Sequence, residues 1–505
     1  MKNNTFLFFI YALLLCSSCT NLDEEIYSNV LREDLFENEQ VLKLYSGRAY
    51  RTLQEYCTEQ SLWTLNLQVA DECAVPVNSV GEWSQTRYRE LQQHNFVVSN
   101  KLIRTGWDFC FNGIAACNRV ISETRSSPLN FIGKERVISE VRMLRAFYYF
   151  CAMDGWGNIP FVINNDDKSY PPQKNRQFIF NFIISEIDSC MPHLDTVPNI
   201  NNYGRITFGV AQTLLAKMYL NAETWLGTPM YDKAEEACLQ VINTGYYAIE
   251  NYYKTNFDVY NENSRENIFV IPYDNIYTVS DHNSFIIYML TLNSVNAEKF
   301  NIPATSWDGF ICQPDFFASY DTADLRRSAT WLYGQQYSHS GVAIDGYVIE
   351  PIFDAGKYLA GRSEIEGAKL WKWTYQDDGQ LKGGETSMSN DFALFRYADV
   401  LYMYAEALLR QGKSVSAATD MADFQKIRLR AGLQPLTSSM TLDDLLLERG
   451  HELAWEGWRR QDLIRFGKFN NAWWAKSASS PHTKLFPIPA ERLSVNPNLE
   501  PNPGY

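Results

Sequence analysis

The chain has 505 residues, 46% of them hydrophobic, which is enough apolar material for one large domain or for roughly two to three ordinary ones. Its formal net charge is −14, and lysine and arginine form no run anywhere, so a nucleic-acid-binding protein and a polybasic lipid-binding segment are excluded. Aromatic residues make up 14% of the chain, a content that suits the stacking of sugars or peptides but that a large core also absorbs.

The N-terminus carries an export signal. Lys2 precedes an apolar run at residues 6–15, which is shorter than the roughly 20 residues of a membrane-spanning helix and is typical of a secretory signal. The run leads into CSSC, which resembles a lipoprotein signal whose cysteine, here Cys19, is acylated and becomes the first mature residue. We therefore expect a lipoprotein signal peptide at 1–18 and a lipidated tether at 19–38. Plain secretion with cleavage nearby is the alternative.

Apolar residues at helical spacing predict a series of helices after the tether. The first four are expected at 39–56, 106–124, 134–155 and 175–193. Two later pairs, 205–225 with 231–247 and 395–412 with 416–433, each join two helices by a short turn. Such pairs look like tetratricopeptide-type units of about 34 residues. The sequence thus predicts a mainly α fold, a tetratricopeptide-like scaffold of about four helix pairs.

The helical pattern is interrupted in the second half of the chain. Over about 246–392 the periodicity fades and Gly, Asn, Asp, Tyr and Trp become frequent, which predicts a loop-rich insertion with short strands. We expect a single domain at 39–505, with its helical scaffold at about 39–245 and 393–470. The Pro- and Asn-rich tail at 484–505 is expected to form an ordered strip pinned to the body.

The cysteines and histidines form no recognisable site. Of the ten cysteines, eight follow the leader, and none of these forms CxxC or lies at metal-binding spacing from a histidine. Several lie in apolar helical runs, which favours small buried hydrophobes over a disulfide scaffold. The six histidines are scattered, and we expect neither a metal nor a cofactor.

No catalytic motif is present: the chain lacks HExxH, GxSxG, a Walker loop and a GxGxxG that opens a helix. Glu448, Glu452 and Glu456 do share one predicted helical stripe, at a separation that an acid–base pair could use. However, they point the same way, and the arginines interleaved with them would lower their pKa values, whereas a general acid needs a raised one. Thr441 and Asp444 can form a capping box at the N-terminus of this predicted helix. We therefore interpret the segment as scaffold.

Four segments together resemble the SusD/RagB family. They are EVRMLRAFYYFCAMDGWGNIPFV at 140–162, FRYADVLYMYAEALLRQG at 395–412 with IRLRAGL at 427–433, LERGHELAWEGWRRQDLIRFG at 447–467, and KLFPIPAERLSVNPNLEPNPGY at 484–505. The resemblance implies a helical, non-enzymatic lipoprotein of the outer membrane that binds nutrients, usually an oligosaccharide and sometimes peptides. It also implies a partner, a SusC-like TonB-dependent barrel on which the protein acts as a hinged lid. The acidic residues that follow Cys19 fit a surface-exposed member of this family.

Ligand contacts in this family lie in variable loops, so the candidate site residues rest on chemistry: sugars are held by aromatic faces and by polar side chains. The first candidate region supplies Trp83, Arg87 and Tyr88, and the insertion supplies Tyr277, Asn283, Trp307, Asp308, Trp331 and Tyr333. For each aromatic residue, packing within the loop core is the alternative. We further expect that Trp83 and Tyr88 can be replaced by alanine with loss of binding and little change in melting.

Three other functions stay open at this point. A lid for a peptide importer would suit the acidic net charge, since basic peptides would be attracted. A surface glycoside hydrolase and a purely structural tetratricopeptide scaffold are the remaining alternatives. The missing carboxylate constellation counts against the hydrolase, and the aromatic-rich insertion counts against the pure scaffold.

Overall fold

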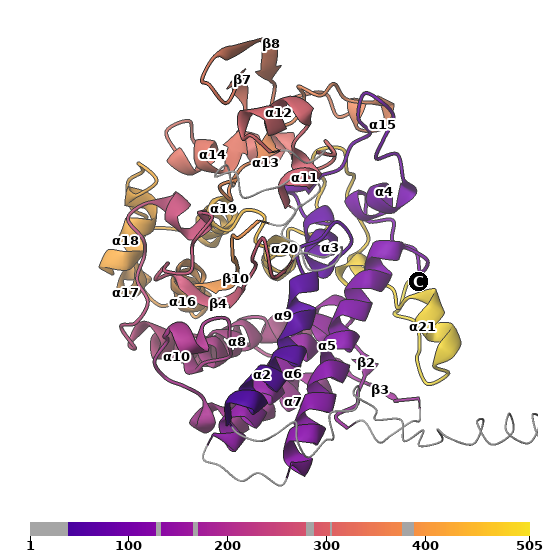
Figure 1. Ribbon diagram of the computed structural model, residues 1–505, viewed down its shortest axis with the longest axis vertical. Coiled ribbons are helices and arrows are strands. Elements are labelled where there is room, and N and C mark those ends of the chain that lie inside the picture. Colours follow the sequence, from indigo (N-terminus) through magenta and orange to yellow (C-terminus); the bar gives the residue numbers. More distant parts are fainter. Residues whose placement is uncertain (1–38, 128–132, 165–169, 279–286, 303–305, 376–387) are drawn as a thin grey trace, which may run out of the picture.

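The structure is a computed structural model that describes residues 39–127, 133–164, 170–278, 287–302, 306–375 and 388–505. Cys19, with the signal peptide and tether predicted around it, lies outside the described residues. Helices from the first half of the chain fill the lower part of the molecule, and the insertion forms the upper part (Figure 1). Across the described ranges, no helix combines the length and the apolar character needed to cross a membrane.

The first half of the chain is a layered set of helices. They are α2 (Glu39–Tyr50), α3 (Leu62–Gln68), α4 (Thr86–Gln92), α5 (Lys101–Ser126), α6 (Lys134–Trp156), α7 (Arg176–Cys190), α8 (Phe208–Leu220), α9 (Ala222–Leu226) and α10 (Tyr231–Ile242), with a 3-10 turn η2 (Arg51–Glu55) after α2. Helices α5 and α6 pack along each other, α6 packs on α7, and α8 packs on α10. These neighbouring antiparallel contacts are those of helix hairpins.

The two longest helices fit together through a local sequence signal and a glycine. Asn100 caps α5, because its side-chain oxygen accepts hydrogen bonds from the backbone N–H groups of Leu102 and Ile103 at 3.0 and 3.4 Å. Gly113 lies under the ring of Tyr148 on α6, and a Cβ at Gly113 would fall 2.4 Å from that ring. The absence of a side chain at Gly113 therefore permits the close approach of α5 and α6.

The late helices complete the scaffold. They are α16 (Tyr397–Arg410), α17 (Ser416–Thr419), α18 (Ala422–Leu429), α19 (Leu442–Glu452), α20 (Arg459–Arg465) and α21 (Ala490–Val495). Helix α16 packs against α10 and α19 and so joins the two halves of the scaffold. The helix predicted at 416–433 is interrupted, since α17 and α18 are separate. The prediction of a mainly α, tetratricopeptide-like fold with a few short strands is confirmed.

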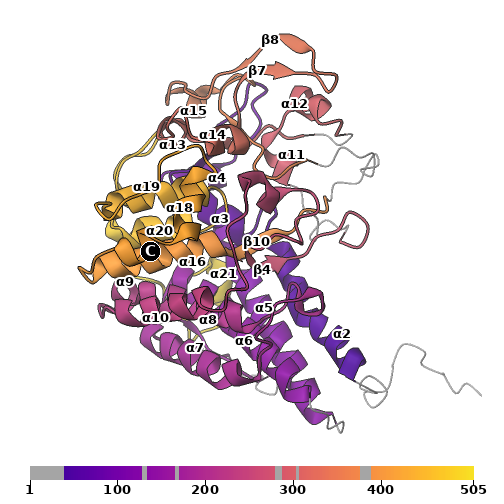
Figure 2. The same cartoon turned by 90° about the vertical axis from the view of Figure 1, so that its left-hand side faces the viewer.

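The insertion consists of short helices and two-stranded ribbons. Its helices are α11 (Ile287–Thr291), α12 (Ser294–Lys299), α13 (Pro314–Ala318), α14 (Leu325–Thr330) and α15 (Lys357–Ala360). Four antiparallel pairs involve strands of the insertion: β1 (Cys73–Ala74) with β5 (Ile311–Cys312), β4 (Asn267–Ile271) with β10 (Phe392–Arg396), β6 (Trp331–Leu332) with β9 (Lys369–Leu370), and β7 (Gly334–Tyr337) with β8 (Ala343–Ile349). A fifth antiparallel pair, nearer the N-terminus, joins β2 (Ile159–Pro160) to β3 (Gln173–Lys174). The β7–β8 hairpin projects at one end in both views (Figures 1 and 2).

The segment 447–467 differs from its prediction as one helix. Helix α19 begins with the expected capping box of Thr441 and Asp444 but ends at Glu452. The chain then turns through Trp455, whose φ is 59°. Tertiary contacts hold this turn, because the indole N–H of Trp63 donates to the carbonyl oxygen of Trp455 at 2.8 Å and the indole N–H of Trp455 donates to the carbonyl oxygen of Glu72 at 2.9 Å.

The C-terminal strip is packed against the end of α6. Phe486 and Ile488 are fully buried. The backbone N–H of Phe486 donates to the carbonyl oxygen of Gly155 at 2.9 Å. The amide of Asn502 donates to the carbonyl oxygens of Trp156 and Phe486 at 2.9 and 2.8 Å. The strip thus covers the point where α6 ends and the chain turns toward β2.

Candidate functional site

A cleft of about 460 Å³ lies where the N-terminal helices meet the insertion. It is bounded by the chain from the end of η2 to the start of α3, by one face of α5 and by Trp307. Its lining residues are mostly polar, with two aromatic rings among them: Glu55, Thr58, Glu59, Gln60, Ser61, Lys101, Thr105, Asp108, Phe109, Asn112 and Trp307. A half-open space with donors, acceptors and a tryptophan is suited to a small polar ligand.

Trp307 is held at the cleft by its backbone. Its N–H donates to the carbonyl oxygen of Met289 at 2.8 Å, and its carbonyl oxygen accepts from the indole N–H of Trp83 at 2.7 Å. Trp307 is only partly buried, and it packs against the edge of the main hydrophobic core. Because the backbone bonds fix the main chain, the ring can serve as a platform without reordering the loop.

Trp83 and Tyr88 lie behind the cleft and do not line it. Tyr88 is fully buried and Trp83 is 9% exposed, and their ring centroids are 5.4 Å apart. Gly309 lies directly on the indole of Trp83, since a Cβ there would fall 2.3 Å from the ring. Their interpretation as sugar-stacking residues is therefore replaced by a supporting role, because neither ring has a face free for a ligand.

This supporting layer also positions an acidic residue of the cleft wall. The hydroxyl of Tyr88 donates to the carboxylate of Glu59, and the guanidinium of Arg87 pairs with the same carboxylate at 3.1 Å. Arg87 also lies over the ring of Tyr88, with 4.8 Å from Cζ to the ring centroid. Burial, followed by the charge of Glu59, raises the pKa of Tyr88 above its ordinary range, so the hydroxyl remains a donor.

Asp308 and Trp331 are not brought to the cleft. Asp308 follows Trp307 in the chain, but its carboxylate is buried in ion pairs with Arg362, at 2.9 Å, and Lys369. Trp331 is 1% exposed and packs edge-on against Trp455 in the core, so it has no face for a ligand.

The predictions for Tyr277 and Asn283 remain open, whereas Tyr333 packs within the insertion. Tyr277 is 87% exposed but does not line the cleft, and Asn283 lies outside the described residues. The partly buried ring of Tyr333 packs edge-on against Phe317, at 5.0 Å between centroids, which is the loop-core alternative.

Sequence reasoning missed most of the polar lining. Lys101, Thr105, Asp108 and Asn112 follow one another at spacings of four, three and four residues, which places them along one face of α5. This polar stripe was visible in the sequence. Glu59 gave no comparable signal, since its place in the cleft depends on contacts with Tyr88 and Arg87.

A second hollow, of about 240 Å³, lies beside β4 and away from Trp307. Tyr203, Tyr246 and Tyr247 contribute to it together with several asparagines. The hydroxyl of Tyr203 donates to the carboxylate of Asp391 at 2.5 Å, and burial raises the pKa of Asp391 to about 6. Its lining contains no tryptophan, which makes it the weaker candidate, and it offers a matched site for control substitutions.

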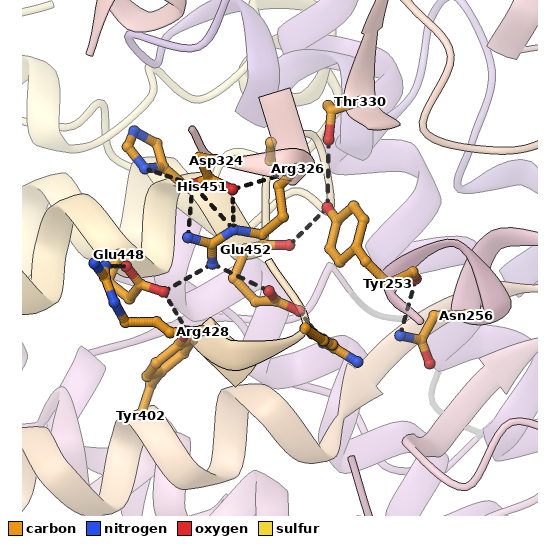
Figure 3. Close-up of polar contacts among 12 residues, drawn as sticks. Tyr253, Asn256, Asp324, Arg326, Thr330, Tyr402, Arg428, Glu448, His451 and Glu452 are labelled. Atoms are coloured by element: carbon orange, nitrogen blue, oxygen red, sulfur yellow. Dashed lines mark hydrogen bonds and ion pairs between the residues drawn. The ribbon is translucent and has the colours of Figure 1, made fainter. Parts of the chain in front are cut away.

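The glutamates of the 447–467 segment belong to a buried ionic network. Figure 3 shows Arg326 between the carboxylates of Glu448 and Glu452, at 2.7 and 3.3 Å. Arg326 also pairs with Asp324 at 2.8 Å, and Arg428 pairs with Glu448 at 2.5 Å. The counter-ions come from other elements, so the prediction that interleaved arginines pair with these glutamates is wrong. Those arginines bind other carboxylates: Arg449 with Asp399 and Asp462, Arg459 with Asp71, Arg460 with Asp154, and Arg465 with Glu406 and Asp462.

The network keeps these carboxylates ionised. Burial alone would raise the pKa of Glu448 and Glu452, but the surrounding arginines outweigh it and lower both, that of Glu452 to about 2. Glu456 lies beyond the end of α19 and pairs with Arg396 and Lys372, each at 2.7 Å. Because Glu448 and Glu452 are buried and ionised, they cannot donate protons to a substrate, which agrees with the scaffold interpretation. In the part of the chain that the structure places, no group of three or more His, Cys, Asp or Glu side chains is arranged to hold a metal ion.

Comparison with known proteins agrees with these features. The model of the SusD family matches residues 250–482. The starch-binding protein SusD of Bacteroides thetaiotaomicron is 27% identical over 411 residues, which cover 73% of this chain and 72% of that protein. A SusD-like protein of Bacteroides ovatus is 22% identical and covers 91% of this chain and 83% of its own length.

Solved structures share the fold. A laminarin-binding SusD-like protein superposes with a TM-score of 0.77 at 22% identity. The match covers 93% of this chain and 100% of that protein's chain. Surface glycan-binding protein A of Bacteroides thetaiotaomicron in complex with laminarihexaose has a TM-score of 0.74 at 19% identity, covering 92% of this chain and 99% of its own. Several of these relatives are named as binding proteins, and none as an enzyme. Residues 250–482 thus match the SusD family, whose members are substrate-binding, non-catalytic proteins, and the chain as a whole shares the fold of SusD-like proteins.

Proposed function

We propose that the protein binds an oligosaccharide in the Trp307 cleft and acts as the lid of a SusC-like TonB-dependent transporter in the outer membrane. The observation that carries the binding proposal is the cleft itself, whose lining combines a partly buried tryptophan with many polar side chains. Sugar rings stack on an aromatic face through their C–H groups while their hydroxyls take hydrogen bonds from the rim. The cleft offers both at once.

The polar lining matches the mixed donor and acceptor character of sugar hydroxyls. Lys101, Gln60 and Asn112 can donate, whereas Glu59 and Asp108 can accept. The volume of about 460 Å³ falls in the range of roughly 300–1,000 Å³ that small-ligand sites occupy. The cleft thus suits a short stretch of a glycan chain, and its openness to solvent lets the chain continue beyond it.

The relatives support a carbohydrate over other ligands. One curated relative is named as a starch-binding protein, and solved neighbours are named for laminarin and laminarihexaose. Starch and laminarin are both glucose polymers, so glucans are the first ligands to test.

The location and the partner are argued from the N-terminal sequence and the family. Acylation of Cys19 would anchor the chain to the outer membrane without a spanning helix. A lipid-anchored binding protein needs a transporter to deliver its ligand across that membrane, and a SusC-like barrel fills this role.

A peptide importer's lid remains the second candidate, and one observation favours it. The cleft contains three acidic residues, Glu55, Glu59 and Asp108, against the single lysine Lys101. An acidic wall attracts basic peptides over long distances at low salt.

The test is a calorimetric titration of residues 20–505 with maltohexaose, laminarihexaose and a tryptic peptide digest. Binding of a glucan, weakened at least about tenfold by Trp307→Ala, supports the proposal; such a loss corresponds to about 1.4 kcal/mol. Tyr246→Ala, in the second hollow, is the matched control and should leave the affinity unchanged. Peptide binding that Trp307→Ala weakens would favour the second candidate, and glucan binding that Trp307→Ala leaves intact would place the site elsewhere.

A further inference from the structure

Two cysteines face each other across a strand pair. Cys73 of β1 and Cys312 of β5 are direct partners in the antiparallel register, and Ala74 pairs with Ile311 next to them. Both cysteines are fully buried, and both are thiols in the structure. They lie far apart in the sequence, since β1 follows α3 and β5 belongs to the insertion.

The hydrogen-bond pattern identifies the type of pair. The N–H of Cys312 donates to the carbonyl oxygen of Ala368 at 3.0 Å, so it does not bond to Cys73. On the flanking position, the N–H of Gln313 donates to the carbonyl oxygen of Glu72 at 3.4 Å. Cys73 and Cys312 are thus a non-hydrogen-bonded pair, in which Cα atoms lie about 4.5 Å apart and side chains approach most closely. Disulfides join residues with Cα separations of about 4.4–6.8 Å.

The side chains also share a face of the ribbon. Cys73 and Cys312 belong to the main hydrophobic core, whereas Ala74 and Ile311 belong to a separate small cluster on the other side. The side-chain amide of Gln313 donates to the carbonyl oxygens of Ala70 and Cys73, each at 2.9 Å, and so fixes the register. A one-residue slip, which would turn one thiol to the opposite face, is prevented by these bonds.

We propose that Cys73 and Cys312 form a cross-strand disulfide in the exported protein, joining the segment that follows α3 to the insertion. The proposal rests on the export that the proposed function includes, because disulfides persist in oxidising compartments outside the cytoplasm. The cross-link would close a long loop of chain and restrict the unfolded state accordingly. It would also hold the segment that leads from Ile311 back to Trp307.

The bond forms by thiol–disulfide exchange with an exported oxidoreductase that carries a disulfide. One cysteine thiolate attacks that disulfide and gives a mixed disulfide; the second thiolate then displaces the enzyme's sulfur. Overall, two protein thiols are oxidised to one disulfide, and the enzyme's disulfide is reduced to two thiols. Burial raises the pKa of Cys312 well above its ordinary value, so the exchange precedes the closing of the core, and the finished bond is shielded from reductants.

The test uses the full-length protein isolated from the envelope of cells that export it. Free thiols are blocked with N-ethylmaleimide in denaturant before any reductant is added, and the peptides are identified by mass spectrometry. We expect a linked peptide that contains Cys73 and Cys312, with the other buried cysteines labelled. Labelling of both Cys73 and Cys312 in the wild-type protein would overturn the inference.

Two variants serve as controls for this test, and one binding measurement separates it from the test of the proposed function. Cys73→Ala should expose Cys312 to the label, and Cys238→Ala, a fully buried cysteine in α10, should leave the linked peptide intact. The same preparation is titrated with laminarihexaose and maltohexaose. Glucan binding without the linked peptide overturns this inference alone, and the linked peptide without glucan or peptide binding overturns the proposed function alone.

Discussion

At the scale of single residues, buried side chains decide where the accessible ones lie. Trp83 does not line the cleft, but its indole N–H donates to the carbonyl oxygen of Trp307 at 2.7 Å and so positions that residue. Likewise, the hydroxyl of Tyr88 donates to the carboxylate of Glu59, a residue of the cleft wall. Because both rings are buried, alanine at either position would cost about 3–5 kcal/mol of stability. The sequence-based expectation of an unchanged melting curve is therefore replaced by a marked loss.

A milder change separates positioning from packing. Trp83→Phe keeps an aromatic ring but removes the N–H that binds the carbonyl oxygen of Trp307, a loss of about 1 kcal/mol. We expect a lower melting temperature and a weaker glucan affinity, since the platform residue loses its anchor. Trp331→Phe, a buried tryptophan outside the cleft, is the control and should lower melting alone. Equal affinities for Trp83→Phe and wild type would show that this hydrogen bond does not position Trp307.

A second residue-scale prediction concerns pH. Burial raises the pKa of Glu72 to about 8, although the backbone N–H of Trp455 and the charge of Arg459 act in the opposite direction. An acid whose folded-state pKa is raised contributes stability below its unfolded pKa of about 4.5 and loses it as the pH rises through 8. Glu72→Gln cannot ionise, so its unfolding free energy should exceed that of wild type at pH 9 and match it near pH 4. A difference that does not change with pH, measured by urea denaturation, would contradict this assignment.

At the scale of elements, hydrophobic periodicity predicted the helices well because each buries one face on a neighbour. It failed at 453–458, where the pattern continues but the chain leaves the helix. The reason is tertiary: Trp455 is held by Trp63 and Glu72, which are distant in sequence. The same limit applies to the site, since burial of Trp83 and Tyr88 depends on the loop at 307–310. The polar stripe of α5, by contrast, could have been predicted from spacing alone.

The buried ionic network gives the element-scale prediction. Arg326 joins α14 to α19 through Glu448 and Glu452. Arg326→Gln would leave these carboxylates under-compensated in the core and should lower the unfolding free energy by about 3–5 kcal/mol. Arg104→Gln removes a partly exposed pair with Glu491, at 3.1 Å, and should cost no more than about 1 kcal/mol. Similar losses for the two variants in chemical denaturation would mean that water or nearby residues compensate the buried charges.

At the scale of the whole molecule, the helical scaffold and the insertion share one core. The main hydrophobic cluster runs from Leu42 to Leu499 and includes residues of both parts. Lys372 of the insertion donates to the carbonyl oxygens of Glu452 and Ala454 at 3.1 and 2.8 Å, which ties the parts together by buried polar contacts as well. Such continuity is unlike the small, polar interfaces that usually separate domains.

This continuity predicts how the protein unfolds. If 39–505 is a single domain, residues 20–505 should unfold in one cooperative transition, because loss of either part exposes the shared core of the other. Tryptophans lie in both parts, among them Trp63 and Trp156 in the scaffold and Trp331 and Trp373 in the insertion, so fluorescence reports on the whole core. Helix content, measured by circular dichroism, reports mainly on the scaffold. Coincident urea transitions by the two methods are expected, and an earlier fluorescence transition with intact helix content would identify the insertion as a separately folding unit.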